Sequence, residues 1–180
     1  MGAMGMTLEK TTNLEWLGQQ MRAKTADYEV TQKDTNLSPI TWEDRCGAVV
    51  SIEDHATKAY CEILVWGGQR ENTMAYNILH RHLASVLYEA LAKDVQRVRF
   101  DLKSFAMKVV KMALFLSLRN YNIFKTDEDK LKFFGINEIK VRTYQEHYAY
   151  LERMVEIMLS DMRDEIDYYA DIYRKELKKS

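Results

Sequence analysis

Apolar residues recur every three or four positions along most of this chain, which is the spacing of helices that bury one side. The first such pattern predicts a helix from Leu14 to about Met21, with Asn13 as its N-terminal cap. Residues 23–39 have little periodicity and indicate a loop or a loosely docked arm.

Two capping boxes follow this segment. Thr41 and Asp44 predict the start of a helix that continues through Val50, and Ser51 and Asp54 predict the start of a second helix. The second helix should end near Trp66, because two consecutive glycines follow that residue. The two starts are only ten residues apart, so we expect two short helices that meet at an angle.

The middle of the chain predicts two longer helices. Asn72 and Thr73 open the first, which should run to about Lys93, and residues 94–100 are a connector. Asp101 can cap the second, from Leu102 to about Phe124. Its residues 112–118 are apolar on nearly every side, and we therefore expect it to be the central buried helix.

The segment 126–144 has the spacing of a helix-turn-helix. Thr126 and Asp129 form a capping box, and Gly135 can adopt the left-handed conformation that ends a helix and turns the chain. The second helix of such a motif can enter a DNA major groove. A structural αα-hairpin with a glycine turn has the same spacing, so both interpretations stay open at this point.

A single long helix is predicted from Asn137 to the C-terminus, because no helix breaker occurs there. Its apolar stripe has nearly three heptads of seam and then shifts register. The members of the stripe are Tyr144, Tyr148, Leu151, Val155, Met158, Met162, Ile166, Tyr169 and Tyr173.

Composition supports an all-α fold: one proline and seven glycines occur in 180 residues. We predict a helical bundle with a helix-turn-helix-like hairpin and a long C-terminal helix. Residues 1–5 resemble an expression scar, residues 6–40 form an N-terminal helix and loop arm, and residues 41–180 form a single helical domain.

Composition and motifs argue against several classes of protein. The longest apolar run is far shorter than a membrane span of roughly 20 residues, and we expect a soluble cytoplasmic protein. Cys46 and Cys61 form no paired motif, and the four histidines lack metal-ligand spacing, so we expect neither a metal nor a cofactor. No phosphate-binding loop, nucleophile elbow or HExxH motif is present, and we expect no enzymatic activity.

Positive charge is concentrated in one part of a chain whose formal net charge is −1. Residues 93–125 hold eight basic and two acidic residues, a local charge of +6, just before the helix-turn-helix-like segment. We expect contacts to phosphates from this cluster and contacts to bases or phosphates from the second helix. The DNA-binding candidates are Lys103, Lys108, Lys111, Asn137, Lys140, Arg142 and Thr143.

The chain resembles the late-gene antitermination proteins of lambdoid phages (the Q type). The likeness runs over about residues 39–160, through Pro39-Ile-Thr-Trp-Glu-Asp44, the helix Phe105–Tyr121, and Phe134-Gly-Ile-Asn137 before a long helix. Those proteins carry a cysteine-rich zinc element before the helix-turn-helix. Here residues 122–127 contain no cysteine, so the zinc site does not carry over. The resemblance implies double-stranded DNA and host RNA polymerase as partners.

The sequence therefore favours a phage-type transcription regulator that binds DNA. The alternative is a non-enzymatic helical protein-interaction module, such as a phage inhibitor of a host complex, with the acidic C-terminal helix as its working surface. The tail after Met162 has few expected partners within the chain. We therefore expect any homodimer contact around Ile166, Tyr169 and Tyr173.

Overall fold

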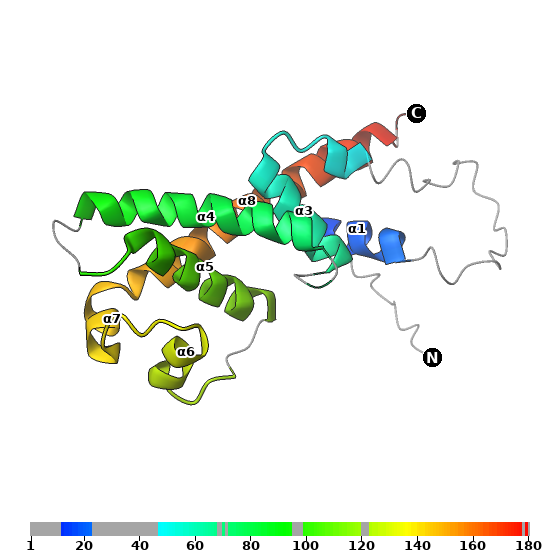
Figure 1. Cartoon of the computed structure of the whole chain (residues 1–180). Coiled ribbons are helices and arrows are strands. Elements are labelled where there is room, and N and C mark those ends of the chain that lie inside the picture. Colours follow the sequence, from blue (N-terminus) through cyan, green and yellow to red (C-terminus); the bar gives the residue numbers. More distant parts are fainter. Residues whose placement is uncertain are drawn as a thin grey trace, which may run out of the picture.

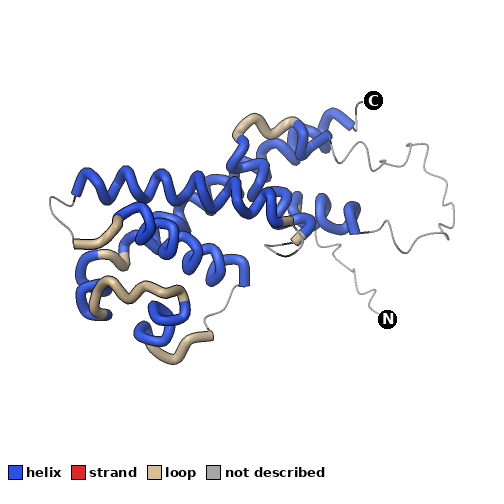
Figure 2. The backbone as a smooth tube through the Cα atoms, viewed as in Figure 1, coloured by secondary structure: helices blue, strands red, loops and turns tan. Residues whose placement is uncertain are grey.

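The computed structural model describes residues 12–22, 47–67, 70, 72–94, 99–119, 123–177 and 179. Within these ranges all regular structure is helical, which confirms the all-α prediction (Figure 2). The helices are α1 (Asn13–Arg22), α3 (His55–Trp66), α4 (Thr73–Asp94), α5 (Leu102–Arg119), α6 (Asp127–Phe133), α7 (Val141–His147) and α8 (Tyr150–Leu177), with a further helical turn at 47–50. The predicted arm at 23–39, the capping box at 41–44 and Cys46 lie outside the described residues.

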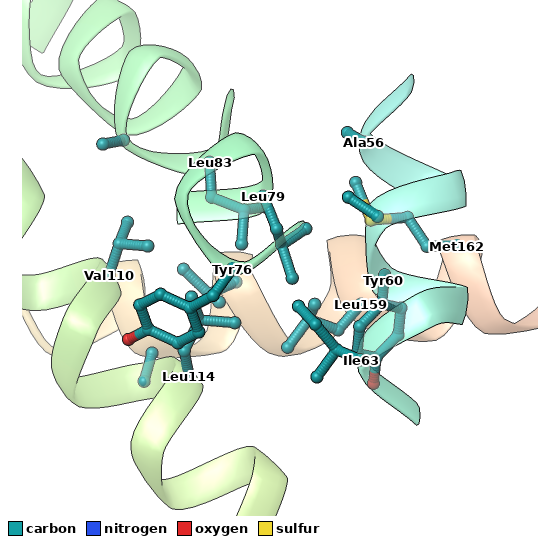
Figure 3. Close-up of a cluster of buried hydrophobic side chains, with 14 of the residues drawn as sticks. Ala56, Tyr60, Ile63, Tyr76, Leu79, Leu83, Val110, Leu114, Leu159 and Met162 are labelled. Atoms are coloured by element: carbon teal, nitrogen blue, oxygen red, sulfur yellow. The ribbon is translucent and has the colours of Figure 1, made fainter. Parts of the chain in front are cut away.

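Helix α8 organises the bundle. Its C-terminal half packs against α3 and α1, and the part nearer its N-terminus packs against α5 and α4. Helices α4 and α5 lie side by side (Figure 1). The core is continuous: side chains of α3, α4, α5 and α8 meet in one apolar cluster, which includes Tyr60, Leu79, Leu114 and Leu159 (Figure 3). Helix α1 contributes Trp16 and Leu17 to the same core.

The apolar stripe of the C-terminal helix is confirmed, with small shifts. Tyr144, Leu151, Val155 and Ile166 are almost fully buried. Leu159 takes the buried place expected for Met158, and Ala170 the place expected for Tyr169. This change follows the drift between a heptad repeat and a straight helix of 3.6 residues per turn.

Two of the predicted caps are wrong, and tertiary contacts explain one of them. Thr12, not Asn13, caps α1, with the Glu15 N–H donating to its hydroxyl at 3.2 Å. Asn13 instead donates to the Asp167 carbonyl and accepts from Arg174. Helix α3 begins three residues later than predicted, where Asp54 Oδ2 accepts from the Thr57 N–H at 2.6 Å.

Ser51 ends the preceding helical turn. Its backbone N–H donates to the Gly47 carbonyl, and its hydroxyl donates to the Ala48 carbonyl. The side chain therefore closes one helix and does not open the next. The end of α3 at Trp66 and the cap of α4 by Asn72 are as predicted.

Helix α5 begins where predicted, after Asp101, but ends at Arg119 and not near Phe124. Its residues 105, 106, 109, 110 and 112–114 are buried, as expected of a central helix, whereas residues 115–118 are only half-buried. Phe124 instead leaves the helix and packs edge-on with Phe134 of the next hairpin.

The C-terminal part is two helices, not the single helix predicted from Asn137. Residues 136–140 are not helical, α7 starts at Val141, and the chain turns again at Tyr148 and Ala149 before α8. Tyr148 packs edge-on against Phe105 at 5.2 Å, so the second turn puts this ring in the core. Because no glycine or proline marks either break, tertiary packing alone places them.

Candidate functional site

The hairpin of α6 and α7 holds four of the seven predicted DNA contacts. Its start and its turn are as predicted: the Asp129 N–H donates to the Thr126 hydroxyl, and Gly135 has φ +69°. The Ile136 N–H donates to the Leu131 carbonyl and the Gly135 N–H to the Lys132 carbonyl, which is a Schellman motif. Leu131 and Ile136 are buried together at this turn.

The later start of α7 changes the positions of the predicted contact residues. Asn137 lies in the connection and not at a helix start, and Lys140 is the N-cap of α7, with no side-chain capping bond. Arg142 is the second residue of the helix and Thr143 the third. Asn137, Lys140 and Arg142 are exposed and Thr143 is half-buried, so three of the four can reach a partner.

Helix α5 approaches this hairpin through an ion pair. The Lys108 ammonium binds the Glu138 carboxylate, joining α5 to the connection before α7. Burial alone would raise the pKa of Glu138, but the hydrogen bond from Lys108, its charge and nearby backbone N–H groups outweigh burial and lower the pKa. Lys108 is therefore occupied within the chain.

The other two lysines of α5 have different surroundings. Lys111 lies near Phe134 of the hairpin, along a hollow that also contains Lys108. Lys103 is five residues before Lys108, about 140° around the helix, and lines a second hollow. The structure thus brings Lys108 and Lys111 to the hairpin and places Lys103 away from it.

Acidic side chains offset much of the positive charge at the hairpin. Arg142 donates to Glu146 at 2.7 Å, although the arginine side chain is 87% exposed. An exposed pair of this kind contributes little stability and exchanges easily for a phosphate. A shallow hollow of about 350 Å³ separates α6 from the start of α7, and its lining includes Lys132, Asn137 and Lys140 but also Glu128.

A buried ionic network, which sequence analysis did not predict, holds the hairpin on α8. Lys130 is 8% exposed, and its ammonium donates to Glu152 at 2.9 Å and lies 3.3 Å from Asp127. The Tyr144 hydroxyl donates to the same Glu152 carboxylate at 2.7 Å, and Gln145 donates to Asp127. The network therefore connects α6, α7 and α8 through paired charges.

The pKa values of this network follow from its pairing. Burial alone would lower the pKa of Lys130, but Glu152 and Asp127 outweigh it and raise the pKa. Burial, followed by the charge of Glu152, raises the pKa of Tyr144. Lysine spacing alone could not distinguish Lys130 from its exposed neighbour Lys132, because the distinguishing partner is 22 residues away.

A longer groove lies between α4 and α5, and sequence reasoning missed it. Two adjoining hollows of about 710 and 490 Å³ share Arg81 and Met107. The His80 Nε2 lies 2.9 Å from the Met107 carbonyl oxygen, so this nitrogen carries the hydrogen and fixes the two helices at that level. The α4 side of the groove also presents Ala84, Ser85 and Tyr88.

No cluster of potential metal ligands occurs among the described residues. No three His, Cys, Asp or Glu side chains come together there as a metal site. Cys61 is fully buried, and burial raises its thiol pKa to about 12, which suits a structural and not a nucleophilic thiol. In the part of the chain that the structure describes, no helix is long and apolar enough to cross a membrane.

Comparison of the chain with protein-family models, with curated proteins and with solved structures gave no match. The resemblance to late antitermination proteins stays a prediction from the sequence.

Proposed function

We propose that this protein is a non-enzymatic transcription regulator that binds double-stranded DNA through the α6–α7 hairpin and the adjoining part of α5. The observation that carries this proposal is the Lys108–Glu138 ion pair. It places the basic helix α5 against the connection that carries Asn137 and leads directly into Lys140 and Arg142, although Lys108 and Glu138 are 30 residues apart in the chain.

Each side chain has a role that suits its position. Lys140 and Lys111 are exposed ammonium groups that would contact phosphates, which position a protein on a duplex. Arg142 and Asn137 have the donor geometry that reads guanine and adenine edges, respectively. Contact with a host RNA polymerase, and an antitermination role, rest on the sequence resemblance alone.

Fluorescence anisotropy with a labelled duplex tests the DNA proposal. The Lys140→Ala, Arg142→Ala double variant should bind at least roughly tenfold more weakly, and wild-type affinity should fall steeply with salt. The control removes two exposed basic groups elsewhere, with Arg70→Ala and Lys179→Ala, and should bind as the wild type does. Equal binding by both double variants, with unchanged helical circular dichroism, would exclude the hairpin as the DNA site.

A gain-of-function variant gives an independent test. Glu138→Gln removes a negative charge from the surface and releases Lys108 from its ion pair. Both effects should raise DNA affinity, roughly threefold to tenfold at low salt. An unchanged or reduced affinity in a correctly folded variant would mean that Lys108 does not face the duplex.

The second candidate is a helical protein-interaction module. The open groove between α4 and α5 favours it, because Tyr88 and Met107 are each 41% exposed there. Exposed aromatic and methionine side chains in a groove are typical of protein-binding surfaces. Absence of DNA binding even at low salt would favour this candidate over the first.

A further inference from the structure

The groove between α4 and α5 combines an apolar floor with a basic rim. Met107 lies at its middle, with Ala84 and Tyr88 on the facing helix. Arg81, Lys103 and Lys111 line its edges, whereas Glu89, at one end, is its one acidic lining residue among those described. This distribution of charge is strongly one-sided in a chain whose net charge is −1.

The groove is a fixed feature of the bundle. Below it, Leu79 and Leu83 of α4 and Val109 of α5 are completely buried, so the two helices cannot move apart without opening the core. Helix α4 has 22 residues and α5 has 18, and the two hollows follow one another along them. A surface of this length, formed by two packed helices, matches the shape of a third helix.

Three of its basic groups lack acidic partners within the described part of the chain. Arg81, Lys103 and Lys111 form no ion pair there, in contrast to Lys108 and Arg142. On the adjoining surface of α4, Met74 is 78% exposed and Ile78 is 43% exposed, seven and three residues before Arg81. Exposed apolar side chains of α4 thus lie within about two helical turns of Arg81.

We propose that this groove binds an acidic amphipathic helix of a partner protein. The apolar side of that helix would cover Met107, Ala84 and Tyr88, and its flanking carboxylates would pair with Arg81, Lys103 and Lys111. Complementary charge identifies the partner as acidic, and the apolar floor between two helices identifies it as helical. A nucleic acid fits less well, because Glu89 and Met107 would face its phosphates.

This inference deepens the second candidate function and does not depend on DNA binding. The first step of the test selects binders from a displayed library of random peptides of about 16 residues, a length that spans about 24 Å as a helix. Enriched peptides should be acidic, with apolar residues at helical spacing. Enrichment of neutral or basic peptides, or no enrichment, would overturn the proposal.

The second step measures the affinity of the most enriched peptide by fluorescence anisotropy. Arg81→Glu with Lys103→Glu should weaken binding by at least roughly tenfold, and Met107→Ala should weaken it roughly threefold to tenfold. The control, Arg70→Glu with Lys179→Glu, has the same change in net charge at exposed positions outside the groove and should bind normally. Thermal melting verifies that all variants fold.

Equal effects of the two charge-reversal pairs would overturn the groove as the binding site. Duplex DNA binding is measured on the same variants, so that the two proposals fail separately. Loss of peptide binding with DNA binding retained supports the groove and leaves the hairpin as the DNA site. Loss of DNA binding in Arg81→Glu, Lys103→Glu but not in Lys140→Ala, Arg142→Ala would assign the groove to nucleic acid and overturn the peptide proposal.

Discussion

Lys130 shows how one charged residue fixes the position of three helices. Its ammonium reaches Glu152 of α8 and Asp127 of α6, and its charge lies 5.9 Å from the Tyr144 ring of α7. A buried charge is tolerated only with such partners, because removal from water costs several kcal/mol per ion. The hairpin that carries the proposed DNA contacts is therefore positioned by this network.

Lys130→Met should destabilise the protein by about 2 to 4 kcal/mol, because it leaves the Glu152 carboxylate partly buried without its cation. The free energy of unfolding is measured by urea titration. Adding Glu152→Gln should recover part of the loss, since the amide oxygen still accepts from the Tyr144 hydroxyl. Lys132→Met is the exposed control and should change stability by less than about 0.5 kcal/mol.

The stabilisation by this network should also depend on pH. Folding raises the pKa of Lys130, so its contribution is fully present below the ordinary value of 10.5 and is lost as the pH rises through the folded value. The hydrogen bond from Gln145, and then Lys130, lower the pKa of Asp127, so its contribution is present above 3.8 and is lost on acidification. A wild-type minus Lys130→Met difference that does not shrink at alkaline pH would contradict this account.

At the scale of elements, sequence signals located helix ends well where the cap is local. Thr126, Asn72 and Asp101 cap the helices for which they were proposed. The errors at Asn13 and at the start of α7 occur where a group distant in sequence makes the deciding contact. The carboxylate of Glu138 binds Lys108 of another helix, and α7 begins only after this contact.

Two glycines in helical segments should respond in opposite ways to alanine. At Gly47 an added Cβ would overlap the Tyr173 hydroxyl and lie 2.6 Å from Cζ, so Gly47→Ala should cost about 1 to 3 kcal/mol. At Gly18 of α1 an added Cβ meets nothing within 4 Å. Gly18→Ala should therefore stabilise by up to about 1 kcal/mol through helix propensity.

Thermal melting of both variants measures this contrast. Tyr173→Phe added to Gly47→Ala removes the hydroxyl overlap and should recover part of the loss. If both alanine variants stabilise the protein, α8 does not approach the helical turn at 47–50 as closely as the structure places it.

At the scale of the whole molecule, the end of α8 completes the core. Ile166 is buried, and Arg163 donates to the Tyr60 hydroxyl of α3 at 2.9 Å. Tyr169 and Tyr173 also pack against the core. Helices α1 and α3 therefore supply partners for the tail within the chain. A homodimer contact at Tyr169 and Tyr173 stays a prediction, whereas Ile166 is already buried within the monomer.

Truncation after Asp161 should abolish cooperative unfolding. It removes Met162, Ile166 and Ala170 from the core, and each large apolar side chain contributes about 1.5 to 3 kcal/mol. That loss approaches the total stability of a typical domain, about 5 to 15 kcal/mol. Truncation after Leu177 is the control and should leave the melting temperature unchanged. A chain ending at Asp161 that melts as the full chain does would show that the tail is dispensable.

Sequence analysis identified the exposed residues of the candidate site but not their arrangement in space. The α6 start, the Gly135 turn and the exposure of Asn137, Lys140 and Arg142 were predictable, because caps, glycine conformation and polarity are local properties. The pairing of Lys108, the burial of Lys130 and the groove at Met107 were not, since each depends on a second helix.

The helical class, most helix starts and the buried stripe of α8 could be read from the amino-acid sequence, since hydrophobic periodicity and capping act within a few residues of chain. Three features follow from packing between helices: the division between α7 and α8, the identity of the buried lysine and the pair of helices that forms the groove. These features arise from contacts between residues far apart in sequence. Tyr148 with Phe105 and Lys130 with Glu152 are two such contacts, and no local pattern encodes either.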